Sequence, residues 1–388
     1  MISQAEYLGR VESIADVVAK DAPAADRSRR LGEDTVRALA DTGLTRMMVP
    51  EALGGGGLTW AEGFPIGEAI SRLDGATGWN ASIWAGAATL VVTLTDDAAR
   101  DEVLGDPAAL CSASLNWMNI AARRVDGGFL FDGRGTFLSG SSHAQWLSLG
   151  GWLHDDAGKA VFGRGGPEVV RGVTPMSSIP VEDTWHVGGL RATSSNDAPL
   201  DAVFIPDAFI SDPARAVDLV PDGASHIPIQ SRFGAPFAYV GVGVARGAID
   251  ALREVAEGRV SLATTSPMRE RVDVQIDIAR AQALIESAGA FLEKTWGELI
   301  AKVQRGERIS TDDQAMLRLS YVNAADSAAQ ATELVRRCAG SAGLYESDRI
   351  ERCWRDAHAV PAHVMVSPRG YERVGRVILG LDPLPGLL

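Results

Sequence analysis

The chain has 388 residues, a formal net charge of −13, and ordinary globular values of 46% hydrophobic and 22% charged residues. This length predicts two or three packed units rather than one simple core. The acidic balance disfavours nucleic acid and anionic membranes as partners, because both demand a basic surface.

The pattern of the sequence changes twice along the chain and predicts a mainly α-helical protein with a β insert. Residues 1–108 hold amphipathic segments with apolar residues at three- and four-residue spacing, which is typical of helices. Residues 109–222 hold short β-rich runs, and "VDGG" (125–128) and "FDGR" (131–134) are turn signals between strands of a small β-domain. Residues 223–388 return to long helices with the apolar stripes of a bundle.

The cysteines and the N-terminus bear on the compartment. Cys111, Cys338 and Cys353 are too sparse for a disulfide framework and lack metal-ligand spacing, so a reducing compartment is expected. The N-terminal stretch has early acids and no apolar core like that of a signal peptide. No run approaches the roughly 20 apolar residues of a membrane span. We therefore expect a cytoplasmic protein.

Three polar, glycine-containing stretches are candidates for ligand contacts. "SGSSH" (139–143) clusters hydroxyl groups beside an imidazole, without the G-x-S-x-G pattern of a nucleophile elbow. "GGLRATSSND" (188–197) could direct donors at an anionic or heteroaromatic ligand. "CAGSAGL" (338–344) joins two helices and could cradle phosphate through backbone N–H groups. On pattern alone, each stretch can equally be a satisfied loop or connection.

Two of the six histidines, His358 and His363, stand in the apolar segment "CWRDAHAVPAHVMV". Five residues apart on a helix, they would point about 140° from each other. They therefore cannot line one side of a site, and they do not form the i,i+4 pair of a zinc helix, so no metal is expected. On spacing alone, each histidine is more often structural than catalytic. Pro361 between them predicts a kink in the helix.

Several motifs, in order, resemble the acyl-CoA dehydrogenase superfamily over nearly the whole chain. They are "GLTRMMVPEALGGGGLTW", "GRGTFLSGSSHAQWLSLGG", "DTWHVGGLRATSSNDAPLDAVFIPDAFI" and "RRCAGSAGLYESDRIERCWRDAH". The resemblance implies an N-terminal helical domain, a β-barrel-like middle domain and a C-terminal four-helix bundle. It also implies a homotetramer with flavin between the β-domain and the bundles.

Within this superfamily the sequence is most similar to the two-component flavin-dependent monooxygenases. It carries their aromatic-x-Ser-Gly followed closely by His, their Gly-Leu-Arg-x-Thr-x-Ser-Asn-Asp, and their Trp-Arg-Asp followed seven residues after the Asp by His. The resemblance implies an oxidoreductase that receives reduced FMN or FAD from a separate reductase. It implies that O2, as co-substrate, forms a C4a-hydroperoxide that oxygenates a small aromatic, heteroaromatic, sulfur or amine substrate.

The resemblance also assigns roles to single residues. His363 matches the active-site histidine, which helps to form the hydroperoxide or deprotonates the substrate. Ser139 matches the hydroxyl near flavin N5, where a hydrogen bond slows collapse of the peroxide. Arg355 and Asp356 are expected to form an ion pair that orients the helix, and His358 is left with a packing or surface role. Further flavin contacts are expected from His143, Thr193, Ser195 and Asn196 at the ring or its chain, and from Gly340, Ser341 and Gly343 at the phosphate end, across a subunit boundary.

Two alternatives stay open. An acyl-CoA dehydrogenase-type desaturase with FAD needs a carboxylate base. Val364 and Ala238 align where such enzymes carry glutamate, so the base would be displaced to another position. A non-catalytic flavin-binding homologue would keep the fold without turnover. Three aromatic residues line either a pocket or, as we favour, the core: Trp84, Phe237 and Tyr239.

Overall fold

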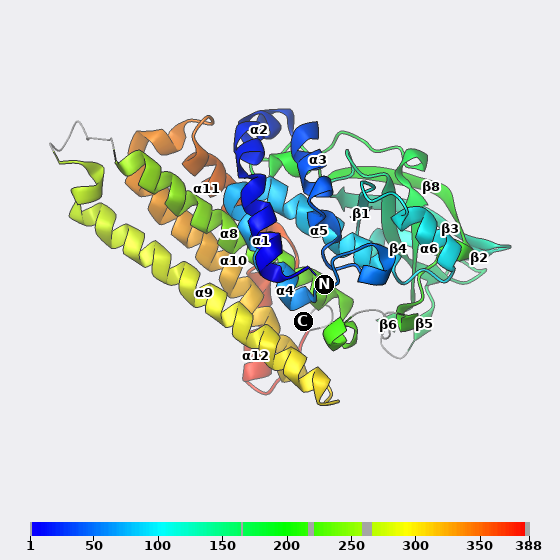
Figure 1. The fold of residues 1–388 in the computed structure, drawn as a ribbon. Helices are drawn as coiled ribbons and strands as arrows, with labels where there is room; N and C mark the ends of the chain where they lie inside the picture. Colours follow the sequence, from blue (N-terminus) through cyan, green and yellow to red (C-terminus); the bar gives the residue numbers. More distant parts are fainter. Residues whose placement is uncertain (1, 164–165, 216–220, 258–265, 385–388) are drawn as a thin grey trace.

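The structure is a computed structural model, described here for residues 2–163, 166–215, 221–257 and 266–384 (Figure 1). It confirms the predicted fold class, because helices come first, a β-domain follows and a helical bundle closes the chain. The N-terminal helices, in blue, lie between the bundle and the β-domain (Figure 1). None of the described helices is long and apolar enough to cross a membrane.

The N-terminal helices begin where the sequence supplies caps. Ser3 with Glu6, and Thr59 with Glu62, form capping boxes that satisfy the first free N–H groups of their helices. One helix, α5, is buried along its whole length, which suits its nearly uniform apolar composition. The helices are α1 (Gln4–Ser13), α2 (Ala15–Ser28), α3 (Glu33–Asp41), α4 (Trp60–Leu73), α5 (Gly75–Val91) and α6 (Asp97–Leu104).

The β-domain is built on one sheet in the order β1-β4-β2-β3-β8, with β7 paired to β4 outside this path. One edge of β4 pairs in parallel with β1 near Trp146 and with β2 near Trp152, while its other edge pairs with β7 in antiparallel register. A separate hairpin joins two very short strands. The strands are β1 (Cys111–Ala113), β2 (Ile120–Val125), β3 (Gly128–Leu138), β4 (Trp146–His154), β5 (Phe162–Gly163), β6 (Gly166–Pro167), β7 (Val169–Pro175) and β8 (Asn196–Pro206).

Of the two predicted turns in this domain, only one is a turn. "VDGG" joins β2 to β3 as predicted. The prediction for "FDGR" is wrong, because these residues lie inside β3, where the pairing with β8 shifts register between Phe131 and Gly133. The Asp132 carboxylate accepts from the Ala202 N–H at 2.8 Å and so braces the irregularity. Continuous pairing with β8 therefore converts a local turn signal into a β-bulge.

The C-terminal helices pack closely on the N-terminal ones. A side chain at Gly243 of α8 would overlap the Glu68 carbonyl of α4, so glycine permits the approach of the two helices. The expected kink at Pro361 is instead the end of a helix, since α11 stops at Ala359 and Pro361 lies in a short 3-10 turn, Val360–Ala362. The helices are α8 (Ile229–Ala256), α9 (Val272–Gln304), α10 (Thr311–Ala339), α11 (Arg349–Ala359) and α12 (Arg369–Ile378).

We retain residues 1–108, 109–222 and 223–388 as a proposed division into domains. The first boundary comes shortly before β1, and the second falls inside the 3-10 turn Pro221–His226, ahead of α8. The strands that form the large sheet begin at Cys111 and end at Pro206, so they all lie within the proposed middle domain.

Candidate active site

Three of the predicted site hydroxyls form one continuous hydrogen-bonded chain. Ser139 follows the last residue of β3, and its Oγ lies 2.7 Å from Ser195 Oγ. Ser195 Oγ lies 2.7 Å from Thr193 Oγ1, and Thr193 donates to the Leu190 carbonyl at 2.8 Å. At the other end, the indole N–H of Trp79, from α5, donates to Ser139 Oγ at 3.1 Å. All three hydroxyl residues are buried.

The direction of this chain follows from proton accounting, since each hydroxyl has one proton to donate. Thr193 gives its proton to Leu190, so the Ser195 proton must serve the Ser195–Thr193 bond. The Ser139 proton must then serve the Ser139–Ser195 bond. Ser139 Oγ accepts from Trp79 and keeps one further lone pair. In this arrangement Ser139 can accept another hydrogen bond but has no proton left to donate.

His363 reaches the same aromatic cluster from the C-terminal segment. Its ring centroid lies 3.9 Å from that of Phe237 in α8 and 5.8 Å from that of Trp79. The Trp79 and Phe237 rings are themselves 4.3 Å apart. Trp79 therefore contacts both Ser139 and His363, two candidates that lie more than 200 positions apart in the chain.

The protonation state of His363 is set by its surroundings. Desolvation of the partly buried imidazole beside the Phe237 ring, followed by the nearby Arg318 guanidinium, lowers the pKa of His363 to about 3. The Met365 N–H donates to Nδ1 at 3.2 Å, so the neutral ring carries its proton on Nε2. Arg318 is buried and holds the segment by donating to the Val364 carbonyl and to Met365 Sδ.

We expect His363 to make the protein sensitive to acid. The folded state holds the imidazole neutral, whereas the unfolded chain takes up a proton below the ordinary pKa of 6.5. The stability linked to His363 is therefore fully present above pH 6.5 and is lost as the pH falls toward 3. Urea unfolding of the wild type and of His363→Gln between pH 7 and pH 4 measures this. The two slopes should differ by up to about 1.4 kcal/mol per pH unit, and parallel slopes would contradict the prediction.

Backbone strain gathers around the hydroxyl chain. Among the described non-glycine residues with left-handed backbone angles, Phe137 (φ 58°), Leu190 (φ 52°) and Ser194 (φ 47°) all belong to the segments that carry the chain. Each such residue costs about 1–3 kcal/mol and persists only where neighbouring contacts hold it. The exposed Phe137 ring meets the edge of Trp185 with centroids 6.2 Å apart. Strain at this density is typical of a functional site rather than of a plain connection.

Two predicted flavin contacts lie against protein groups. His143 is buried with Nδ1 3.4 Å from the Arg30 guanidinium, and burial, followed by Arg30, lowers its pKa. The Asn196 side-chain oxygen accepts from the N–H groups of Thr184 and Trp185, at 3.1 and 3.0 Å. The structure thus gives His143 and Asn196 neighbours other than the hydroxyl chain, and their contact with flavin stays a prediction.

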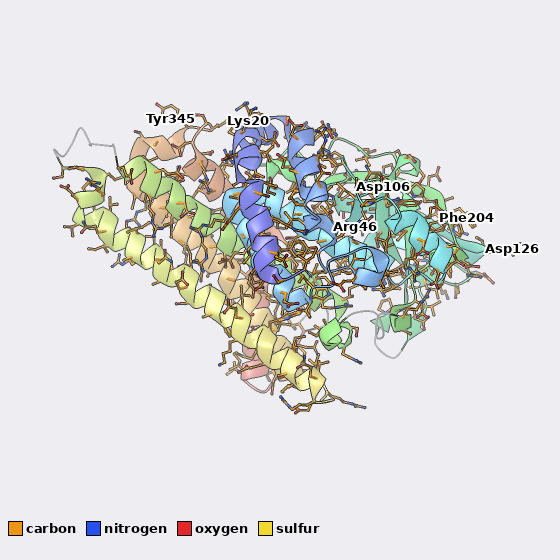
Figure 2. All side chains as sticks on the ribbon, in the orientation of Figure 1. Lys20, Arg46, Asp106, Asp126, Phe204 and Tyr345 are labelled. Atoms are coloured by element: carbon orange, nitrogen blue, oxygen red, sulfur yellow. The ribbon has the colours of Figure 1, made fainter. Side chains whose placement is uncertain are left out.

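The predicted phosphate-end residues lie elsewhere. Gly340, Ser341 and Gly343 belong to a 3-10 turn, Gly340–Leu344, which packs on α10 and α11. Figure 2 shows Tyr345, which follows this turn, at the opposite end of the molecule from Phe204 of the β-domain. Among the described residues, no hydrogen bond joins Gly340, Ser341 or Gly343 to Ser139 or His363, and their role at the phosphate end across a subunit boundary remains a prediction.

The Arg-Asp pair of the C-terminal signature has a different arrangement from the one expected. Arg355 makes ion pairs with Asp26 of α2 and Glu351 of α11, at 2.9 and 2.8 Å, rather than with its neighbour Asp356. Asp356 instead accepts from the Leu190 N–H at 2.6 Å. The expectation of an Arg355–Asp356 ion pair is therefore wrong, because adjacent helical residues point in different directions.

His358 is exposed on α11, with Nδ1 2.8 Å from the Trp354 carbonyl. It lines a groove of about 470 Å³ between α9, α10 and α11. The three aromatic residues that were candidates for a pocket do not lie together. Phe237 contacts His363, whereas Tyr239 stacks on Phe64 and Trp84 is buried in the core.

Sequence reasoning missed Trp79 and Arg318. Trp79 lies in an apolar run that predicts only a buried helix, and Arg318 lies in an ordinary bundle pattern. The sequence signal that could have indicated them is a side chain with a polar group on an otherwise apolar helix face. Such a group requires a hydrogen-bond partner once it is buried. The identity of that partner is visible only in three dimensions.

Comparison with known proteins is consistent with this geometry. Residues 7–109 match the profile "Acyl-CoA dehydrogenase, N-terminal domain", and residues 235–368 match "Acyl-CoA dehydrogenase, C-terminal domain". Indole-3-acetate monooxygenase of Pseudomonas putida is 30% identical over 94% of this chain and 91% of its own length. The oxygenase component of FADH(2)-dependent resorcinol hydroxylase from Rhizobium sp. is 28% identical over 97% and 94% of the two chains.

Solved structures extend the likeness to the fold. The crystal structure of the HsaA monooxygenase from M. tuberculosis superimposes with a TM-score of 0.87 at 27% identity, covering 98% of this chain and 99% of that one. The matches run over nearly the full length of the chain. The chain therefore belongs to the acyl-CoA dehydrogenase superfamily, in its branch of two-component, flavin-dependent monooxygenase oxygenase components.

Proposed function

We propose that the protein oxygenates a small aromatic or heteroaromatic substrate at a site between Ser139 and His363. As an oxygenase component of its branch, it uses reduced flavin and implies a separate flavin reductase. Bound reduced flavin supplies the chemistry of dioxygen activation and transfer of one oxygen atom. The remaining steps of binding, orientation and proton control belong to the residues of this chain.

The observation that carries this proposal is the spare lone pair of Ser139. A reduced flavin presents an N–H group at N5, and the hydroxyl chain leaves Ser139 able to accept but not to donate. The donor set thus suits the reduced form of the cofactor. Phe137, two residues before Ser139, meets Trp185 edge to face, and such a pair of aromatic rings suits a planar ligand. We propose that Ser139 holds the N5 proton in place, with Thr193 and Ser195 orienting the Ser139 hydroxyl.

We further propose that His363 acts as a hydrogen-bond donor through Nε2. An imidazole whose pKa lies near 3 is a weak base at neutral pH, so it is poorly suited to take a proton from a substrate. Its Nε2–H has no protein acceptor among the described residues. Of the two roles that the sequence left open, assistance to the reaction with dioxygen is therefore favoured.

The proposed substrate class rests on the walls of the site and on the relatives. Trp79 and Phe237 present apolar rings beside His363, which favours an aromatic substrate over a charged aliphatic one. Relatives named for indole-3-acetate and resorcinol suggest the first compounds to try. Oxygen consumption and product formation with these two compounds and 4-hydroxyphenylacetate, with reduced FMN or FAD supplied by a reductase, test the class.

The experiment that tests the site mixes protein loaded anaerobically with reduced flavin against oxygenated buffer. A transient that absorbs in the near ultraviolet should precede the spectrum of oxidised flavin. In Ser139→Ala the lifetime of this transient should fall by about 10-fold, the loss expected for one hydrogen bond of about 1–1.5 kcal/mol. Ser141→Ala, a buried serine two positions on and outside the hydroxyl chain, is the matched control. Direct oxidation in the wild type, as fast as free flavin, would contradict the proposal.

Assembly and location form a separate part of the proposal. We propose a homotetramer, supported by large apolar side chains exposed on the bundle, including Val272, Leu344 and Ile378. Light scattering coupled to size-exclusion chromatography tests it, and a monomer would contradict it. A cytoplasmic location is supported by the three cysteines, which are all free and buried.

A further inference from the structure

The turn that ends the hydroxyl chain is strained and must be held by its surroundings. It runs from Gly188 to Ser195, and both Leu190 and Ser194 have left-handed backbone angles that their side chains disfavour. At one end, Ser194 Oγ donates to the Arg29 carbonyl of the N-terminal domain at 2.5 Å. At the other end, the contacts come from the α11 helix of the bundle.

Two adjacent residues of α11 contact three consecutive residues of this turn, Gly188, Gly189 and Leu190. Arg355 donates through one guanidinium nitrogen to the Gly188 carbonyl at 2.8 Å. Asp356 accepts from the Leu190 N–H at 2.6 Å, inside the core. Between them, Gly189 lies so close that a side chain there would overlap the Arg355 carbonyl. The turn is therefore clamped to α11 by a charge-assisted hydrogen bond from Arg355, a buried hydrogen bond to the Asp356 carboxyl group, and a backbone contact that only glycine allows.

Leu190 is the clamped residue, and its two backbone groups belong to neighbouring peptide units that meet at its Cα. Its N–H donates to Asp356, and its carbonyl, in the next peptide unit, accepts from the Thr193 hydroxyl and so sets the direction of the hydroxyl chain. The same carbonyl accepts from the Trp185 indole at 3.0 Å. If the Leu190 carbonyl turned away, Thr193 would lose its acceptor, and the protons of the chain could reverse. Ser139 would then present a proton where the spare lone pair now lies.

We propose that Asp356 and Arg355 are positioning residues, which fix the backbone of residues 188–190, hold the adjoining Leu190 carbonyl toward Thr193, and thereby keep Ser139 as a hydrogen-bond acceptor. This inference rests on the proposed function for its consequence at Ser139, although the clamp itself is independent of flavin. It gives the Arg-Asp pair a specific task. The same segment that delivers His363 to one side of the site fixes the hydroxyl chain on the other.

Charged neighbours of the clamp act on the Asp356 carboxyl group in opposite directions. Burial, and then the Asp74 carboxylate at the start of α5, raise the pKa of Asp356 to about 7, while Arg352 and Arg355 oppose the shift. Arg355 is itself neutralised by Asp26 and Glu351. Asparagine at position 356 would keep an oxygen acceptor for the Leu190 N–H without the charge. Alanine would remove the acceptor altogether.

The clamp is tested first in flavin-free protein by amide hydrogen exchange of peptides covering residues 188–195. In Asp356→Ala the Leu190 amide should exchange at least about tenfold faster, as expected for loss of one buried hydrogen bond. Asp356→Asn should restore most of the protection. Asp277→Ala is the matched control, because Asp277 is a buried carboxylate of the bundle that pairs with Arg337 and contacts neither the turn nor Arg355. Unchanged exchange in Asp356→Ala would overturn the clamp.

The consequence for Ser139 is tested by a double-variant cycle on the lifetime of the near-ultraviolet transient. Asp356→Ala alone should shorten it about as much as Ser139→Ala, roughly 10-fold. If Asp356 acts through Ser139, the transient of the double variant should decay no faster than that of Ser139→Ala alone. Effects that multiply would overturn the positioning role, even if the exchange result holds.

A second route guards against misfolding of the first variant. Gly189→Ala pushes the turn away from α11 without changing any charge, so it should raise exchange at residues 188–195 and shorten the transient. Normal exchange and lifetime in a folded Gly189→Ala would contradict the proposal. If the wild type forms no transient, the proposed function fails, while the exchange experiment still decides the clamp.

Discussion

Replacing His363 by alanine is expected to slow the reaction with dioxygen by about 10²-fold, the lower range for removal of a preorganised hydrogen-bond donor at a reacting centre. The reason is geometric. The imidazole packs on the Phe237 ring and accepts from the Met365 N–H through Nδ1, which leaves the proton on Nε2. Alanine would leave an open space beside Trp79 and no donor. Single-turnover experiments with reduced flavin, dioxygen and the preferred aromatic substrate measure the rate.

His358→Ala is the matched control for this experiment. It removes the same kind of side chain from the same segment, five positions earlier, where the ring is exposed and bound to the Trp354 carbonyl. The control should turn over like the wild type, and both variants should bind reduced flavin. A normal rate in His363→Ala, or a comparable loss in His358→Ala, would count against the assignment of His363.

Trp84→Ala should destabilise the protein by about 3–5 kcal/mol, as expected when a buried aromatic side chain is removed from a close-packed core. Trp84 is 1% exposed, and its indole fills the space above Gly140, where a side chain would overlap it. Part of the loss is apolar burial, and part is the cavity that the surrounding helices cannot close. Urea unfolding followed by circular dichroism measures the change.

Trp84→Phe separates packing from hydrogen bonding. The Trp84 indole N–H has no acceptor in the described part of the chain, so its removal sacrifices no hydrogen bond. Phenylalanine should therefore recover most of the stability that alanine loses. A loss within about 0.5 kcal/mol for Trp84→Ala, the range of ordinary surface substitutions, would show that Trp84 is not a core residue.

Local signals in the sequence predicted elements wherever the local preference and the tertiary contacts agree. The order of helices, strands and helices follows from hydrophobic periodicity, which is a property of short segments. "VDGG" is a turn because the strands on each side pair directly with each other. "FDGR" carries a similar local signal, yet pairing with β8 and the Asp132–Ala202 hydrogen bond hold it within a strand. Tertiary contacts there outweigh the local preference.

The candidate site divides in the same way. Motif resemblance was sufficient to select Ser139, Thr193, Ser195 and His363, although their roles stay predictions. It also selected Asn196, whose side-chain oxygen accepts from two backbone N–H groups and whose contact with flavin likewise stays a prediction. Trp79 could not be selected, because nothing in an apolar helix indicates which N–H faces a serine of another domain.

By itself, the sequence determined the fold class and the branch of the family, because periodicity and ordered motifs are written along the chain. Only the tertiary structure decided the direction of the hydroxyl chain, the low pKa of His363 and the clamp on the backbone of residues 188–190. Asp356 and Leu190 are 166 positions apart and meet at 2.6 Å. Hydrogen bonds and desolvation act through space over a few ångströms, so their partners are unknown until the chain has folded.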